Sequence, residues 1–165
     1  MLIQQNVDGS NFFNRSWMEF KVGFGDESGN YWLGNDLLSQ LTLTGRYKLR
    51  FDLQSRSNGS WYYAEYSTFT VLSEAEKYRM RVTGYSGNAG DAFRYHNNKM
   101  FSTYDSDNDV WSDNCAASRG GGFWYRSCDS VQINVPRVGG SGTFRWLILP
   151  HSIALQTSRM QLICK

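Results

Sequence analysis

Hydrophobic and polar residues alternate over two stretches of the chain, Tyr47–Leu53 and Tyr62–Val71. A period of two residues is typical of a β-strand that buries one face. The dipeptide Asn58-Gly59 lies between the two stretches and is a strong hairpin signal, because both residues tolerate a positive φ. A third strand is predicted over Tyr78–Tyr85, and the chain also begins as a strand. This pattern predicts an antiparallel sheet.

Two other segments carry helical signals. Ser16 is a favourable N-cap residue and predicts a short helix over the residues that follow it. A second short helix is predicted after Asn35, with Leu37, Leu38 and Leu41 as its buried stripe. The sequence therefore predicts an α+β fold in which a central antiparallel sheet is flanked by short helices.

The pattern changes after about residue 86. Gly, Asn, Asp and Ser dominate as far as Asp129, and the only regular structure predicted there is a turn of helix near Ala92. A long loop region inside a compact domain is usually functional or is ordered by a ligand. We therefore expect this part to hold the binding site.

Composition narrows the class of protein. The chain has 165 residues, enough for one domain with a sizeable core, and a net charge of +2 without any run of Lys or Arg. Nucleic-acid binding needs a concentrated basic surface, so it is not expected. The longest apolar stretches, such as Trp146–Leu149, are too short for membrane insertion. The first residues do not resemble a signal peptide, and the chain is expected to begin inside a longer protein.

Three cysteines are present, at positions 115, 128 and 164. Outside the cell Cys115 and Cys128 are the natural pair, because they enclose a short loop; three unrelated buried thiols are the alternative.

Two histidines, His96 and His151, are distant in sequence and lie in no nucleophile motif, so the sequence does not indicate an enzyme. His96 is expected to be a loop or core residue.

The acidic run Asp105-Ser106-Asp107-Asn108-Asp109 is the clearest chemical feature. Alternate carboxylates repel one another unless a hard cation neutralises them, and oxygen-only ligands favour Ca²⁺ over zinc or copper. A solvated acidic turn is the alternative. An EF-hand is excluded by counting from Asp105, because its sixth and twelfth positions would be Val110 and Ala116 instead of Gly and Glu.

Longer motifs resemble the fibrinogen C-terminal (fibrinogen-related) domain. The matching runs are Gly84–Phe93, Phe101–Asp109, Asn114–Ala116, Asp8–Ser10, Ser16-Trp17, Gly23–Gly25 and Tyr31–Asn35. The resemblance implies one domain over residues 1–165, truncated at its N-terminus. Residues 1–85 and 144–165 would form the part with the sheet and helices. Residues 86–143 would form the loop-rich part that binds calcium and a ligand.

The resemblance also implies particular site residues. The side chains of Asp107 and Asp109 and the main-chain carbonyls of Trp111 and Asp113 would bind Ca²⁺, with Asp105 as a supporting carboxylate. Cys115 and Cys128 would form the family's disulfide, and the peptide bond before Cys128 would be cis.

Lectins of this family, such as ficolins and tachylectins, hold acetyl groups beside the second cysteine. This chain departs from their pattern, because Asp129 replaces a His and Arg119 replaces a Tyr. The expected ligand-binding residues are Arg119, Ser127, Cys128, Asp129, Gly140 and Ser141. They predict a secreted, calcium-dependent domain that binds glycans or anionic microbial cell-wall components, in a full-length protein that is oligomeric. The alternative is an assembly module that binds a peptide N-terminus through Asp129.

Overall fold

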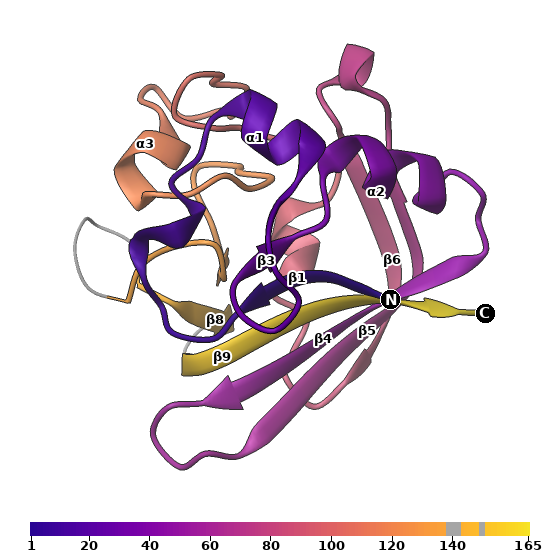
Figure 1. Cartoon of the computed structure of the whole chain (residues 1–165). Helices are drawn as coiled ribbons and strands as arrows, with labels where there is room; N and C mark the ends of the chain where they lie inside the picture. Colours follow the sequence, from indigo (N-terminus) through magenta and orange to yellow (C-terminus); the bar gives the residue numbers. More distant parts are fainter. Residues whose placement is uncertain (138–142, 149–150) are drawn as a thin grey trace.

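The computed structural model describes residues 1–137, 143–148 and 151–165 (Figure 1). Its strands are β1 (Leu2–Asn6), β2 (Phe24–Gly25), β3 (Tyr31–Trp32), β4 (Tyr47–Ser55), β5 (Trp61–Val71), β6 (Met80–Gly87), β7 (Val131–Gln132), β8 (Arg145–Ile148) and β9 (His151–Cys164). Its helices are α1 (Trp17–Val22), α2 (Asn35–Thr42) and α3 (Cys115–Arg119), with 3₁₀ turns η1 (Asn11–Phe13), η2 (Glu74–Glu76) and η3 (Phe93–His96).

The described strands form one antiparallel sheet. Its main path has the order β2-β3-β1-β9-β4-β5-β6, and the short pair β7 and β8 joins it through β9. The last long strand in sequence therefore lies between the first strand and the hairpin. The predicted central antiparallel sheet of an α+β fold is confirmed.

The predicted hairpin is present. Strands β4 and β5 pair up to Gln54 and Trp61, and Gly59 in the turn has a φ of +72°. The third strand starts two residues later than predicted, at Met80, because Tyr78 adopts a φ of +51° that is incompatible with a regular strand.

Helix α1 begins as predicted, with a capping box in which Ser16 and Glu19 each accept a backbone N–H from the other. The buried stripe predicted for α2 is partly wrong. Leu38 is buried and Leu41 is half-buried, but Leu37 is 44% exposed. The buried face instead carries polar residues, because the Thr42 hydroxyl accepts from the backbone N–H of Val71 and donates to the carbonyl of Leu38.

Helices α1 and α2 lie on one side of the sheet, beside the loop-rich segment that contains α3 (Figure 1). The only helical elements of the described chain between Gly87 and Val131 are η3, which is the predicted turn near Ala92, and α3, which the sequence did not predict. Its buried aromatic residues join the main core: the Phe101 ring centroid is 5.8 Å from that of Trp32 and 5.2 Å from that of Trp124. The loops are therefore part of the packed domain.

Buried polar residues also tie the loop-rich segment to the sheet. The Gln4 amide in β1 donates to the Ile133 carbonyl at 3.2 Å and to Asn134 Oδ1 at 3.0 Å.

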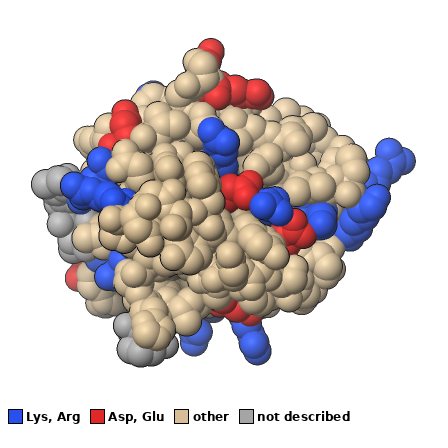
Figure 2. Space-filling view, turned by 90° about the horizontal axis from the view of Figure 1, so that it is seen from below, with Lys and Arg blue, Asp and Glu red and all other residues tan. Residues whose placement is uncertain are grey.

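On the face shown in Figure 2, side chains of both charge signs are dispersed among uncharged residues. In the part of the chain that the structure describes, no helix has the length and apolar character needed to cross a membrane.

Candidate functional site

The disulfide predicted between Cys115 and Cys128 is present, with a Cα–Cα distance of 5.6 Å. Helix α3 begins at Cys115 because the Asn114 side chain accepts from the backbone N–H of Ala117 and so caps it. The peptide bond between Ser127 and Cys128 is cis, as the family resemblance implied. The third cysteine, Cys164, is exposed and unbridged at the end of β9.

The acidic loop, residues 105–113, is folded around its own carboxylates. Asp109 accepts the backbone N–H of Trp111 at 2.8 Å through Oδ1 and that of Cys115 at 2.9 Å through Oδ2. Asp107 Oδ1 accepts the N–H of Asp109 at 3.3 Å. Burial raises the pKa of Asp109 above its ordinary value, and the nearby Asp107 carboxylate adds to the rise. The loop therefore brings Asp107 and Asp109 together, as the calcium prediction requires.

The third carboxylate has a different role. Asp105 Oδ1 accepts the backbone N–H of Trp17 at 2.9 Å and the Thr103 hydroxyl at 2.7 Å. Trp17 is the first residue of α1, so a negative charge is placed at the positive end of the helix. Asp105 thus connects the acidic loop to α1.

The donor set of this loop suits a hard cation. Asp107 and Asp109 would supply carboxylate oxygens, and the exposed residues Trp111 and Asp113 would add carbonyl oxygens, without any sulfur or nitrogen ligand. Among the described residues there is no group of three or more His, Cys, Asp and Glu side chains suited to a metal ion. A site here would therefore need main-chain carbonyls and water in addition to the two side chains.

Arg119 and Asp129 form an ion pair, with 3.1 Å between Arg119 Nε and Asp129 Oδ2. A ligand has little access to this pair, because the Asp129 side chain is only 1% exposed and the Arg119 side chain is 20% exposed. The other Asp129 oxygen accepts from the Gln132 amide. Burial raises the pKa of Asp129, although Gln132 and Arg119 oppose the rise. Both carboxylate oxygens are thus engaged inside the protein, which removes the simplest way for Asp129 to bind an amine.

The chain before Cys128 is the exposed part of this region. Arg126 and Ser127 are both exposed, and the Tyr95 hydroxyl donates to the Ser127 carbonyl at 3.3 Å. The Arg126 guanidinium lies over the Tyr95 ring, 5.0 Å from its centroid. Val110 in the acidic loop donates its N–H to the Arg126 carbonyl at 3.2 Å. The acidic loop therefore supports the exposed segment directly. Two further predicted ligand-binding residues, Gly140 and Ser141, lie outside the described residues.

A buried histidine, His96, contacts the chain on both sides of the exposed residues Arg126 and Ser127. His96 is completely buried; its Nδ1 donates to the Trp124 carbonyl at 2.8 Å. Its Nε2 accepts the N–H groups of Ser130 at 3.1 Å and Val131 at 3.0 Å. Burial lowers the pKa of His96 to about 4, so the ring is neutral near pH 7. His96 is the core histidine that the sequence suggested, but the roles of Tyr95 and Gln132 had no signal in the sequence.

Comparison with known proteins gives consistent matches. The profile of the fibrinogen beta and gamma chains, C-terminal globular domain, matches residues 1–153. The human fibrinogen alpha chain is 46% identical over 149 residues, which cover 81% of this chain and 17% of the relative. The chain thus spans less than a fifth of that relative.

Solved structures agree with the sequence matches. The fibrinogen-like globe domain of human ANGPTL2 is 37% identical with a TM-score of 0.90, covering 99% of this chain and 79% of that domain. A lamprey fibrin D-dimer, complexed with the peptide ligand Gly-His-Arg-Pro-amide, is 28% identical with a TM-score of 0.84. That match covers 98% of this chain and 60% of the lamprey chain.

Proposed function

This chain belongs to the family of fibrinogen C-terminal globular domains, and on that premise we propose that it is an extracellular module that binds a protein partner. Proteins of this family are structural or binding proteins and not enzymes, in agreement with the sequence-based expectation. The observation that carries the proposal is the match to the lamprey fibrin D-dimer. That match covers 98% of this chain, and the lamprey structure contains a peptide ligand.

The proposed contact surface is the exposed segment Arg126–Ser127 with the adjacent Tyr95. Arg and Tyr are enriched among the residues that dominate protein interfaces. The disulfide at Cys128, the hydrogen bond from Tyr95 and the His96 contacts all hold this segment, so little conformational entropy would be lost on binding. Because the Asp129 carboxylate is engaged by Arg119 and Gln132, a free peptide N-terminus is not required by this proposal.

A peptide library with a glycan array in parallel tests this function. We expect peptides to be selected in calcium-containing buffer, and Ser127→Trp to weaken their binding about tenfold or more by blocking the surface. Ser60→Trp is the matched control, because Ser60 is an exposed serine in the β4–β5 hairpin loop. Selection of glycans alone, including N-acetylated sugars, would contradict the proposal and favour the lectin alternative.

We further propose that Ca²⁺ binds the acidic loop and stabilises the adjacent contact surface. Asp107 and Asp109 would hold it by their side chains, and Trp111 and Asp113 by their carbonyls. The bound ion would neutralise the two carboxylates. The hydrogen bond between Val110 and Arg126 would then connect the ion site to the proposed contact surface.

Calcium titration of thermal stability tests this second proposal. At a hundredfold excess over its dissociation constant, Ca²⁺ is expected to raise the free energy of unfolding by about 2–3 kcal/mol. Asp107→Asn should abolish this gain, because it removes a ligand charge. Asp113→Asn should retain it, since the proposed ligand is the Asp113 carbonyl. Equal loss in the two variants, or no effect of chelation on the parent protein, would rule the proposed ligand set out.

A further inference from the structure

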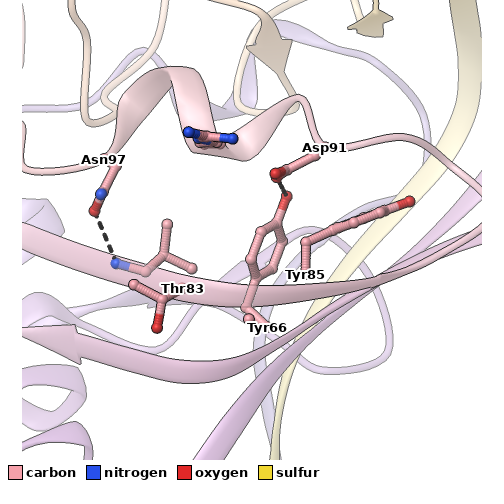
Figure 3. A pocket seen from close by; sticks show the side chains of 8 residues that line it. Tyr66, Thr83, Tyr85, Asp91 and Asn97 are labelled. Atoms are coloured by element: carbon pink, nitrogen blue, oxygen red, sulfur yellow. Dashed lines mark hydrogen bonds between the residues drawn. The ribbon is translucent and has the colours of Figure 1, made fainter.

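A polar cavity of about 370 Å³ lies between strand β6 and the segment that contains η3 (Figure 3). Strand β6 is the last strand on its side of the sheet path. None of the residues that line the cavity belongs to the surface around Cys128. The polar lining residues are Tyr66, Thr83, Tyr85, Asp91, Arg94 and Asn97. This volume is in the range of sites for small ligands or single sugar units.

Hydrogen bonds at both ends of the cavity hold it open. At one end, Asn97 Oδ1 accepts the backbone N–H of Val82 at 2.9 Å. At the other end, the Tyr66 hydroxyl donates to Asp91 Oδ1 at 2.8 Å (Figure 3). The Tyr85 hydroxyl accepts the N–H of Gly90 at 2.8 Å. The segment from Gly90 to Asn97 is thus fixed over the strand, so the space beneath it is preformed.

The cavity is lined by one anionic side chain, Asp91, and one cationic side chain, Arg94. Asp91 is half-buried and uses one oxygen for Tyr66, while Arg94 is exposed. Within the described residues, neither Asp91 nor Arg94 takes part in an ion pair at 4.0 Å or less. A carboxylate accepts from hydroxyl groups and a guanidinium donates to anions, so one ligand can satisfy both.

A second cavity, of about 400 Å³, continues along the same strand. It shares Thr83 and Asn97 with the first and adds Arg81 and Asn98. The charged side chains that line the two cavities are Arg81, Arg94 and Asp91, so the lining carries a net positive charge. This net charge favours an anionic ligand.

We propose that these cavities bind an acidic saccharide, with one uronate unit in the first cavity. Its hydroxyl groups donate to Asp91, and its carboxylate accepts from Arg94. The half-buried ring of Tyr85 forms the wall against the C–H groups of the sugar, and the buried ring of Tyr66 packs behind it, with the two centroids 5.7 Å apart. A neutral sugar would leave Arg94 and Arg81 without an anion. An acidic peptide side chain would offer Asp91 no hydroxyl donor. This proposal is independent of peptide binding near Cys128.

Calorimetric titration with glucuronate, glucose and acetate tests the proposal. Glucuronate is expected to bind about tenfold or more tightly than either glucose or acetate, because only glucuronate engages both charged groups. Arg94→Gln should reduce glucuronate binding to the level of glucose. Arg56→Gln should leave it unchanged, since Arg56 is an exposed arginine in the β4–β5 loop and lines neither cavity.

Asp91→Asn separates a saccharide site from simple anion attraction. Asn retains an acceptor for the Tyr66 hydroxyl but removes the negative charge from the cavity. If sugar hydroxyls donate to Asp91, this substitution weakens glucuronate binding. Tighter binding of both glucuronate and acetate would overturn the proposal, because it would mean that Asp91 only repels the anion. Absence of glucuronate binding, or equally tight binding of a blocked acidic peptide, would also overturn it.

Discussion

His96→Gln is expected to flatten the pH dependence of stability between about pH 6.5 and pH 4, and to destabilise the protein at pH 7. The ring is buried and neutral, with a pKa of about 4 against an ordinary value of 6.5. Within this window the unfolded chain binds more protons than the folded protein, so stability falls as the pH falls. The folded protein has its full stability with respect to His96 above pH 6.5. Between pH 6.5 and pH 4, this single titration lowers the free energy of unfolding by about 3 kcal/mol.

The loss at pH 7 arises from hydrogen bonds. His96 satisfies the Trp124 carbonyl and the N–H groups of Ser130 and Val131, all in the interior or partly buried. Gln can replace some of these contacts but fills the space less well, so we expect a cost of about 1–3 kcal/mol.

Denaturant unfolding of the parent and the variant from pH 4 to pH 7.5 measures both effects. The raised pKa values of Asp109 and Asp129 act in the opposite direction, but they are common to both proteins and largely cancel in the difference. His151→Gln, at an exposed position in β9, is the control for replacing a histidine by glutamine. If the free energy of unfolding depends on pH in the same way for the parent and for His96→Gln, His96 is not held neutral in the folded protein.

Local signals account for the elements that the sequence predicted correctly. The β4–β5 hairpin has its turn residues and its alternating strands next to each other in the chain. Helix α1 has both members of its capping box within four residues, from Ser16 to Glu19. Helix α3 was missed because it is short and has little apolar periodicity, although Asn114 supplied a capping signal.

Elements that depend on distant partners could not be predicted in the same way. Strand β9 pairs with β1 on one side and β4 on the other, and nothing near residue 151 specifies either neighbour. The exposed side of α2 is another example. Leu37 has the same side chain as the buried Leu38, and only the packing of the helix on the sheet decides which of them is covered.

The candidate site shows the same division. The acidic loop and the Cys115–Cys128 disulfide were visible as short motifs, and the structure places them together. The burial of Asp129 was not visible, because it requires Arg119 and Gln132 to converge on one carboxylate. A sequence shows that two residues carry opposite charge, but their exposure decides whether the pair contributes little or a great deal to stability.

Arg119→Met is accordingly expected to be the most destabilising of these single substitutions, at about 3–5 kcal/mol near pH 7. It leaves the Asp129 carboxylate buried, with the Gln132 hydrogen bond and the charge of Arg145, which does not form an ion pair with it within 4.0 Å in the described structure, as weaker compensation. The double variant Arg119→Met with Asp129→Asn should recover most of the loss, because Asn removes the buried charge and keeps an acceptor for Gln132. Unfolding in denaturant at pH 7, for both variants and the parent, measures these differences.

Lys48→Met provides the comparison with a more exposed ion pair. Lys48 is 33% exposed, and its partner Glu65 keeps a second contact from Arg50 at 2.9 Å, so we expect a cost of about 1 kcal/mol or less. Similar losses in Lys48→Met and Arg119→Met, or no recovery in the double variant, would contradict the buried-charge argument.

The pH dependence of Arg119→Met gives a second, independent readout. Without the arginine, burial should raise the pKa of Asp129 further above its ordinary value of 3.8, so the folded protein binds a proton more readily than the unfolded chain. Stability relative to the parent should therefore increase as the pH falls from 7 toward 4, as the carboxyl becomes neutral. A simple loss of packing would reduce stability equally at every pH, so an unchanged difference across this range would assign the effect to packing and not to charge.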